Sequence, residues 1–244
     1  MHKESIKIVD NADTAVLFIH GIIGTPEHFS DFVKLVPADM SFCNMLLDGH
    51  GKGVSDFSKT SMAKWKKQVS DKIDELEKTH KNIIIVAHSM GTLFAISEAI
   101  NRKQTVKKLF LIASPLKLFI KPSMFINVAK VYFNKVRDDD KHAASAKRAY
   151  GIKDSKNIFK YLGWIPRYLE LFSEIKSVRK LVTELSTPCV VFQSRFDEMV
   201  SFKAVKILLK NNNINVHILE NSTHYYYNEQ DYALLLESFK NYIA

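Results

Sequence analysis

Short apolar segments alternate along the chain with longer segments whose apolar residues recur at helical spacing. The short segments span residues 15–19, 42–47, 83–87, 108–113, 189–193 and 216–219. Most of them are almost wholly apolar, which is typical of central strands covered on both faces. The helical pattern occupies residues 26–36, 61–78, 92–102, 202–210 and 229–243. Strands that alternate with helices predict an α/β fold, with a mainly parallel central sheet flanked by helices.

One interval breaks this alternation. Between Pro115 and Pro188 the chain shows no good strand pattern but contains many aromatic residues. The interval predicts several helices, interrupted by a charged run at residues 137–141 and by helix breakers at Gly151 and residues 163–166. A helical insertion at one end of a sheet is best explained as a cap over a site. The expected division is a core of residues 1–115 and 186–244 with a helical cap, or lid, of residues 116–185.

Length and composition indicate a single globular domain and the compartment in which the protein is expected to work. With 244 residues, 46% of them hydrophobic and 25% charged, the chain has the size and balance of one globular domain. The N-terminus lacks the features of a signal peptide, and no stretch approaches 18 uncharged apolar residues. Cys43 and Cys189 lie in apolar runs and are expected to be buried free thiols. These observations favour a cytoplasmic protein without a membrane span.

The net charge of +9 raises the question of an anionic partner. Basic surfaces attract nucleic acid, anionic lipid or acidic substrates. Here the lysines are spread along the chain and usually mixed with acidic residues, as in residues 71–78, and no nucleic-acid-binding motif accompanies them. We therefore expect a solvated, lysine-rich surface and no nucleic-acid partner, while contact with a lipid interface stays open.

Candidate chemistry begins with Ser89. This serine lies where a predicted strand runs straight into a predicted helix, with the small residues Ala87 and Gly91 two positions away on either side. A strained strand-to-helix turn of this kind lifts a hydroxyl above the carboxyl end of the sheet, and small neighbours let the backbone pass close to adjacent elements. Alanine at the first small position is a mild departure from glycine. The pattern predicts that Ser89 is a nucleophile rather than a turn or N-cap residue.

A glycine-rich turn, His20-Gly21-Ile22-Ile23-Gly24, directly follows the first predicted strand. Backbone N–H groups of such a turn can point at a developing oxyanion. We assign one donor to the N–H of Ile22 and the other to that of Met90, the residue after the nucleophile. A phosphate-binding loop is excluded, because the turn has no G-x-G-x-x-G pattern and no Lys-Ser/Thr pair follows it. His20 is expected to hold the turn by hydrogen bonding.

A serine hydroxyl is a poor nucleophile until a base takes its proton, so a histidine and an orienting carboxylate are expected. His224 lies just after the last predicted strand, in a loop that should converge on the site, whereas the side chain of His88 is expected to point away. Asp197 follows another predicted strand and supplies the carboxylate, while the adjacent Glu198 is expected to point elsewhere. The order Ser89, Asp197, His224 is the chain order of α/β-hydrolase triads.

With these motifs the chain resembles the bacterial carboxylesterases and monoacylglycerol lipases of the α/β-hydrolase superfamily, along nearly its whole length. The resemblance is carried by residues 20–24, 49–51, 88–91, 194–200 and 222–224. It implies a helical cap after the sixth strand and ester hydrolysis through an acyl-enzyme, with no metal and no cofactor. The family often has proline two residues before the Gly-His-Gly histidine, where this chain has Asp48.

The functional hypothesis is a serine carboxylic-ester hydrolase that acts on a small-molecule substrate, a short- to medium-chain or monoacylglycerol-type ester. Feruloyl- or cinnamoyl-type esterases, thioesterases and acyltransferases share the triad and stay open, and a non-catalytic ligand-binding protein on this fold is less favoured. Aminopeptidase activity has less support, because no acidic cluster is evident for a substrate amine. The aromatic cap suggests an acyl chain or an aromatic acid. The expected pocket walls are Leu116, Phe119, Ile120 and Trp164.

Overall fold

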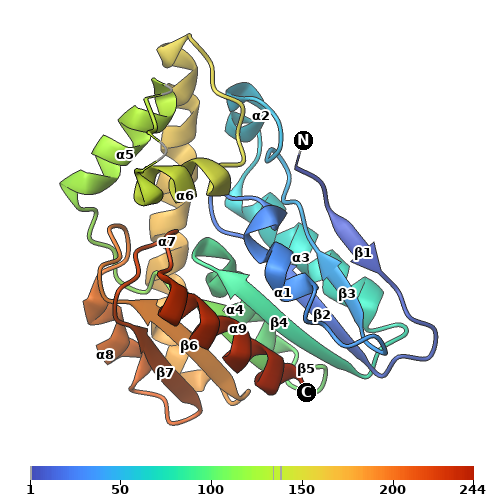
Figure 1. Cartoon of the computed structure of the whole chain (residues 1–244). Coiled ribbons are helices and arrows are strands. Elements are labelled where there is room, and N and C mark those ends of the chain that lie inside the picture. The colour runs from blue at the N-terminus through green and yellow to red at the C-terminus, as the bar shows by residue number, and fades with distance from the viewer. Residues whose placement is uncertain (1, 134, 138) are drawn as a thin grey trace.

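Seven strands form one sheet in the order β1-β3-β2-β4-β5-β6-β7 (Figure 1). The computed structural model describes residues 2–133, 135–137 and 139–244. The strands are β1 (Ser5–Lys7), β2 (Thr14–Ile19), β3 (Ser41–Asn44), β4 (Asn82–His88), β5 (Val106–Ile112), β6 (Cys189–Ser194) and β7 (Ile214–Leu219). All neighbouring strands are parallel except β1 and β3, which are antiparallel. The prediction of a mainly parallel α/β sheet is confirmed.

Helices cover both faces of this sheet (Figure 1). Outside the β5–β6 connection they are η1 (Pro26–Phe29), α1 (Ser30–Val33), α2 (Val54–Ser58), α3 (Met62–Leu76), α4 (Met90–Asn101), η4 (Phe202–Ala204), α8 (Val205–Leu208) and α9 (Glu229–Ile243). Leu17 of β2 packs into the core on the α3–α4 side, whereas its neighbour Phe18 packs into the core on the α1–α9 side. Since both faces of the strand are buried, the sequence of β2 is continuously apolar.

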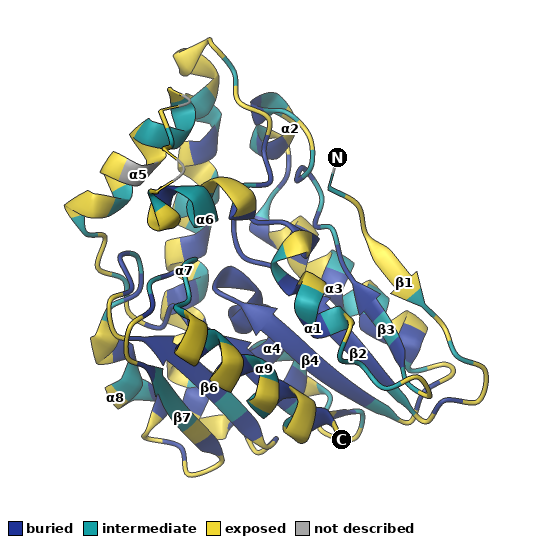
Figure 2. Cartoon of the chain, viewed as in Figure 1, coloured by how far each residue is buried: buried dark blue, intermediate teal, exposed yellow. Residues whose placement is uncertain are grey.

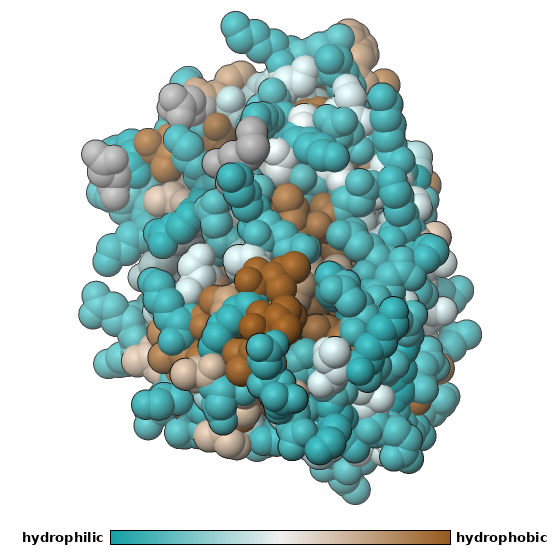
Figure 3. Space-filling view, turned by 90° about the vertical axis from the view of Figure 1, so that its right-hand side faces the viewer, coloured by the Kyte–Doolittle hydropathy of each residue, from teal (hydrophilic) through white to brown (hydrophobic). Residues whose placement is uncertain are grey.

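Two strands differ most from the sequence prediction. β3 ends at Asn44 rather than at residue 47, because the N–H of Leu47 donates to the ring of His20 instead of to a neighbouring strand. β1 was not expected, because a segment of three residues, two of them polar, is too short to show the apolar pattern of a strand. Short, polar edge strands are common, because they limit pairing with other chains. The face seen from the β1 side is mostly hydrophilic with an apolar area near its centre (Figure 3).

The connection from β5 to β6 contains α5 (Pro122–Tyr132), α6 (Lys141–Ala149), η2 (Ile158–Trp164), α7 (Ile165–Leu181) and η3 (Val182–Glu184). It follows the fifth strand, not the sixth, because only β1 to β5 precede it. α7 runs back toward the sheet, whereas α5 lies on the outside of the molecule and is largely exposed (Figures 1 and 2). The division into a core and a separate cap of residues 116–185 stays a prediction.

Both cysteines are buried free thiols, as expected: Cys43 lies in β3 and Cys189 in β6. Burial raises the pKa of the Cys43 thiol to about 12, so this thiol is not reactive at neutral pH. Among the described residues, no helix combines the length and the apolar character needed to cross a lipid bilayer.

Candidate active site

Ser89 lies at the turn between β4 and α4, at the carboxyl end of the sheet. Its backbone has φ 51° and ψ −121°, a conformation that residues other than glycine rarely adopt. The Ser89 N–H donates to the carbonyl of Ile112 at 2.9 Å, and its carbonyl accepts from the N–H and hydroxyl of Thr92 at 2.9 and 2.7 Å. These bonds hold the strained backbone of Ser89 in place, and so they fix the point from which its side chain extends.

Two glycines allow the backbone to close around Ser89. A Cβ atom at Gly91 would lie 2.3 Å from the carbonyl oxygen of Ile19, so α4 can approach the end of β2 only with glycine there. A Cβ atom at Gly21 would lie 2.9 Å from the Cβ of Ser89. The glycine-rich turn after β2 therefore lies directly against the serine.

Hydrogen bonds fix the glycine-rich turn from both sides. The carbonyl of Gly21 accepts from the N–H of Gly24 at 3.1 Å and from Nδ1 of His20 at 2.8 Å. The other ring nitrogen of His20, Nε2, accepts from the N–H of Leu47 at 3.1 Å, which assigns the proton of the neutral ring to Nδ1.

Met90 is the first residue of α4, so its N–H has no partner within the helix.

His224 and Asp197 are in direct contact. Nδ1 of His224 lies 2.8 Å from Oδ2 of Asp197. The second oxygen of that carboxylate accepts the backbone N–H groups of Met199 and Val200, both at 2.7 Å. Among the described residues, Nε2 of His224 is buried without a hydrogen-bond partner. One nitrogen of the imidazole is therefore held by a carboxylate, and the other is available to take a proton.

Two carboxylates tune His224. Burial disfavours the charged imidazole, but the negative charges of Asp197 and Glu198 outweigh it and raise the pKa of His224 above 6.5. Glu198 is buried, and its Oε2 accepts the backbone N–H of His224 at 3.0 Å. Its carboxylate thus contacts the main chain of His224, while Asp197 contacts the ring. Sequence reasoning gave Glu198 no role, because no pattern in the sequence marks a contact with a backbone N–H group.

The expectation that the side chain of His88 points away from the site is wrong. Its Nε2 donates to the carbonyl oxygen of His224 at 3.2 Å, and the two rings are 4.8 Å apart. His88 is the last residue of β4, so its side chain reaches the loop after β7 from the strand end. The residue before Ser89 thus holds the loop that carries His224.

Four other histidines, linked to one another or to His224 by ring contacts, are neutral. Burial lowers the pKa of His20 to about 4 and of His28 to about 3, and it holds the pKa values of His50 and His88 well below 6.5. His224 differs from these four histidines, because its pKa is raised. Within residues 2–133, 135–137 and 139–244, no group of three or more His, Cys, Asp or Glu side chains is arranged to hold a metal ion.

The four expected pocket walls occupy different places. Leu116 is fully buried in the core, and Trp164 is nearly buried, with its Nε1 donating to a carbonyl of α2 at 3.1 Å. Phe119 and Ile120 are exposed, and Phe119 lines a cavity of about 580 Å³ that also reaches Asp197. The assignment of these four side chains to an acyl pocket stays a prediction.

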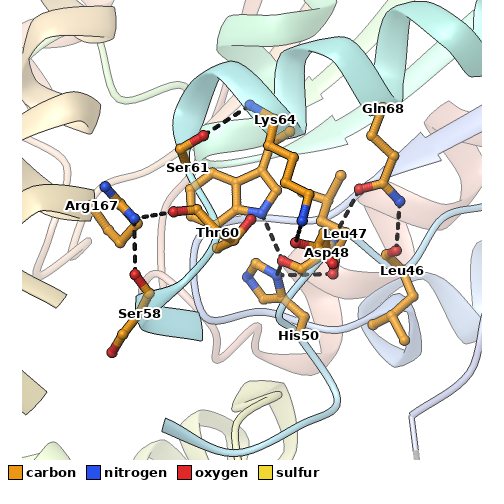
Figure 4. Close-up of polar contacts among 11 residues, drawn as sticks. Leu46, Leu47, Asp48, His50, Ser58, Thr60, Ser61, Lys64, Gln68 and Arg167 are labelled. Atoms are coloured by element: carbon orange, nitrogen blue, oxygen red, sulfur yellow. Dashed lines mark hydrogen bonds and ion pairs between the residues drawn. The ribbon is translucent and has the colours of Figure 1, made fainter. Parts of the chain in front are cut away.

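The Gly49-His50-Gly51 loop is anchored by α3 (Figure 4). The carboxylate of Asp48 pairs with Lys64 at 2.8 Å, and its carbonyl accepts from Nε1 of Trp65 at 2.8 Å. The side chain of Gln68 accepts the N–H of Asp48 and donates to the carbonyl of Leu46. Asp48, which stands where the family often has proline, therefore serves to fix this loop to the helix.

A profile of the family described as serine aminopeptidase, S33, matches residues 10–231. The chain belongs to this family. It is accordingly a serine hydrolase with the α/β-hydrolase fold. A comparison of this hydrolase with curated protein sequences gave no match.

Solved structures resemble the hydrolase over almost its whole length. One is described under the metagenome-derived lipolytic enzymes LipS and LipT, with TM-score 0.75 and 19% identity, covering 99% of this chain and 96% of the other. The monoacylglycerol lipase of Paleococcus ferrophilus has TM-score 0.69 and 16% identity, covering 98% of each chain. Est1E of Butyrivibrio proteoclasticus with bound ferulic acid has TM-score 0.67 and 17% identity, covering 99% and 93%. At these identities the similarity shows the shared fold.

Proposed function

We propose that the protein hydrolyses carboxylic esters through an acyl-enzyme formed on Ser89. The observation that carries this proposal is the state of His224, whose Nδ1 is held by Asp197 while Nε2 is buried and unpartnered among the described residues. His88 contacts the His224 loop directly and precedes the serine, so the two loops meet at the site.

In the proposed reaction, Nε2 of His224 takes the hydroxyl proton as the oxygen of Ser89 attacks the ester carbonyl carbon. The N–H groups of Ile22 and Met90 donate to the resulting oxyanion. Asp197 keeps the imidazole in the required tautomer and balances its positive charge. The bond to the alcohol then breaks, and the alcohol leaves with the proton from His224. Water repeats the same steps on the acyl-enzyme, which releases the acid and restores Ser89.

We infer that the substrates are short- to medium-chain or monoacylglycerol-type esters. Similar folds belong to a monoacylglycerol lipase and to an esterase with bound ferulic acid, so aromatic acyl groups form the second candidate class. A thioesterase domain also shares the fold, and thioesters or acyl transfer would use the same groups. Hydrolysis rates on alkyl esters of rising chain length, monoacylglycerol, methyl ferulate and an acyl thioester separate these classes.

The family description names aminopeptidases, which gives a second reaction class. A peptidase and an esterase would use the same serine and histidine, but an aminopeptidase must also bind a substrate ammonium group. Glu198, the carboxylate beside Asp197, is already engaged by the N–H of His224. We therefore favour esters, and matched p-nitrophenyl esters and amino-acid p-nitroanilides test this preference directly.

We also infer that the segment of residues 116–185 contacts lipid interfaces. It contains 15 Lys and Arg against 7 Asp and Glu, so it carries +8 of the net charge of +9. In the rest of the chain, 20 Lys and Arg nearly balance 19 Asp and Glu. Of the 18 exposed large apolar side chains among the described residues, 12 lie in the same segment. Apolar side chains among basic residues suit an anionic lipid surface.

Ser89→Ala tests the proposed function. We expect hydrolysis of p-nitrophenyl esters to fall by about 10³- to 10⁶-fold and labelling by a fluorophosphonate to disappear. Ser114→Ala is the matched control, because its buried hydroxyl has no partner among the described residues and no proposed role. Native activity in Ser89→Ala would contradict the proposal, and a wild-type protein that neither labels nor hydrolyses would instead be a non-catalytic ligand-binding protein.

A further inference from the structure

Gly151, in the connection between α6 and η2, bridges two loops at the candidate active site. Its N–H donates to the carbonyl of Ile23 at 2.7 Å, and its carbonyl accepts from the N–H of Gly51 at 2.7 Å. Two residues later, the N–H of Lys153 donates to the carbonyl of Lys52 at 2.8 Å. Residues 151–153 therefore join the glycine-rich turn to the Gly49-His50-Gly51 loop.

This contact requires glycine at position 151. A Cβ atom there would lie 2.1 Å from the carbonyl oxygen of Gly24 and 2.9 Å from its carbonyl carbon. Both are backbone atoms, so a side chain could be accommodated only by moving the turn. The partner loop on the other side of Gly151 cannot easily follow such a movement, because α3 anchors it through Asp48 (Figure 4).

Two peptide groups connect Gly151 to the proposed oxyanion donor. The carbonyl of Ile23, which Gly151 binds, belongs to the same peptide group as the N–H of Gly24. That N–H donates to the carbonyl of Gly21, which belongs to the same peptide group as the N–H of Ile22. Linked peptide groups orient and polarise one another. The bond from Gly151 thus fixes the plane of the first peptide group, and that group fixes the plane of the second.

The turn needs such support. Ile23 has φ 52°, a left-handed conformation that is unfavourable for a β-branched residue. Without an external partner for its carbonyl, the peptide group after Ile23 would be free to rotate toward a more relaxed conformation. Gly151 supplies this partner, and it does so from the segment between β5 and β6.

We propose that Gly151 is a positioning residue for the reaction: it aims the N–H of Ile22 at the oxyanion, so that docking of the 116–185 segment completes the oxyanion hole. The inference rests on the proposed function, because it needs the oxyanion of the tetrahedral intermediate that forms when Ser89 attacks the ester carbonyl. Gly151 itself touches no reacting atom. By orienting the N–H of Ile22, Gly151 helps to stabilise the transition state. It does not affect the contact between His224 and Asp197.

Gly151→Ala tests this role, with Gly163→Ala as the matched control. A Cβ at Gly163 would also clash, at 2.7 Å from the Cβ of Ser58, but it would separate η2 from α2 and not touch the turn. In Gly151→Ala we expect kcat to fall by about 10- to 100-fold, somewhat less than the loss on removing a whole oxyanion donor. We expect KM to change little, and the acid limb of the pH profile to stay in place.

Affinity for an alkyl trifluoromethyl ketone gives the decisive readout. Ser89 adds to the ketone carbonyl, its proton passes to His224, and the oxyanion formed occupies the same donors without any leaving group. The affinity for the ketone should fall in Gly151→Ala by the same factor as kcat and stay native in Gly163→Ala. Native ketone affinity in Gly151→Ala, or equal losses in both variants, would overturn the inference.

Two further measurements complete the test. If Gly151→Ala does not fold, scalar couplings across the hydrogen bonds from Gly151 to Ile23 and from Gly24 to Gly21 are measured by NMR in the wild-type protein. The presence of both couplings supports the proposed chain of hydrogen bonds from Gly151 to the turn, and their absence overturns it. Hydrolysis that persists in Ser89→Ala overturns the proposed function together with this role. If hydrolysis depends on Ser89 but keeps its native rate in Gly151→Ala, this role alone is overturned.

Discussion

Nε2 of His88 lies 3.2 Å from the carbonyl oxygen of His224, although 136 residues separate the two histidines in the sequence. The first ends β4 and the second lies in the loop after β7, and β4 and β7 are not neighbours in the sheet. It ties the loop of the proposed base to the turn of the proposed nucleophile. Because burial keeps His88 neutral, the bond fixes geometry without adding a charge next to His224.

His88→Phe should therefore slow catalysis without shifting its pH dependence. The ring remains, but the carbonyl of His224 loses its donor, and an unsatisfied buried acceptor costs about 1–3 kcal/mol. We expect kcat to fall by about 5- to 150-fold where this energy is lost from the transition state, since about 1.4 kcal/mol corresponds to a tenfold change in rate. His28→Phe is the control, because Nε2 of His28 has no partner among the described residues. Equal rate losses in both variants would show a packing effect instead.

Glu198→Gln should move the acid limb of kcat/KM to lower pH. In the proposed reaction His224 must be neutral to take the serine proton, so its raised pKa sets the acid limb of the wild-type profile. Removing the negative charge of Glu198 weakens the stabilisation of the imidazolium, so the neutral base persists to lower pH. The amide oxygen of glutamine can still accept the N–H of His224.

The matched control for this charge change is Glu237→Gln, which removes one carboxylate from the exposed face of α9. Rates are measured from pH 5 to 9 at constant ionic strength for both variants and the wild type. An equal shift in the two variants would point to the net charge of the protein and would contradict a local effect of Glu198.

The sequence was sufficient to predict six of the seven strands and the loops that carry Ser89, Asp197 and His224. Strands buried on both faces are continuously apolar, as in β2, and this signal is strong. Parallel strands bring their carboxyl ends to one edge of the sheet, so residues just after such strands are expected near one another. The hydrogen bond between Asp197 and His224 joins two loops of this kind.

The supporting contacts could not be predicted in the same way. Gly151 was interpreted as a helix breaker, and only the folded chain shows that its backbone meets Ile23. A contact between two main-chain groups leaves no pattern in side-chain chemistry. The charge of residues 116–185 is different, because a count by segment would have revealed it in the sequence.

Gly91→Ala should destabilise the fold more than Ala87→Gly, the change at the other small position of the turn. The new Cβ would lie 2.3 Å from the carbonyl oxygen of Ile19, and both atoms belong to fixed backbone. Overpacking of a tight core costs about 1–3 kcal/mol, occasionally more. Ala87→Gly creates no clash and should cost about 1 kcal/mol through backbone entropy. Urea unfolding of both variants measures the difference, and equal stabilities would refute the close approach of α4 to β2.

Binding to anionic vesicles tests the surface of residues 116–185. Phe125 and Ile126 lie on α5, none of whose described side chains is buried (Figure 2). We expect the wild-type protein to float with vesicles that contain phosphatidylglycerol and much less with pure phosphatidylcholine vesicles. Binding should weaken as salt rises, because the attraction of the basic residues is screened. The double variant Phe125→Ser with Ile126→Ser should lose most of this binding.

A second double variant, Ile6→Ser with Ile8→Ser, removes two apolar side chains of similar exposure from the N-terminal edge of the sheet. It should bind vesicles like the wild type, because it leaves the basic segment unchanged. Hydrolysis of a soluble short-chain ester should stay native in both double variants, since neither alters the loops of Ser89, Asp197 and His224. Equal loss of vesicle binding in both would indicate general surface hydrophobicity and would contradict a lipid-facing role for α5.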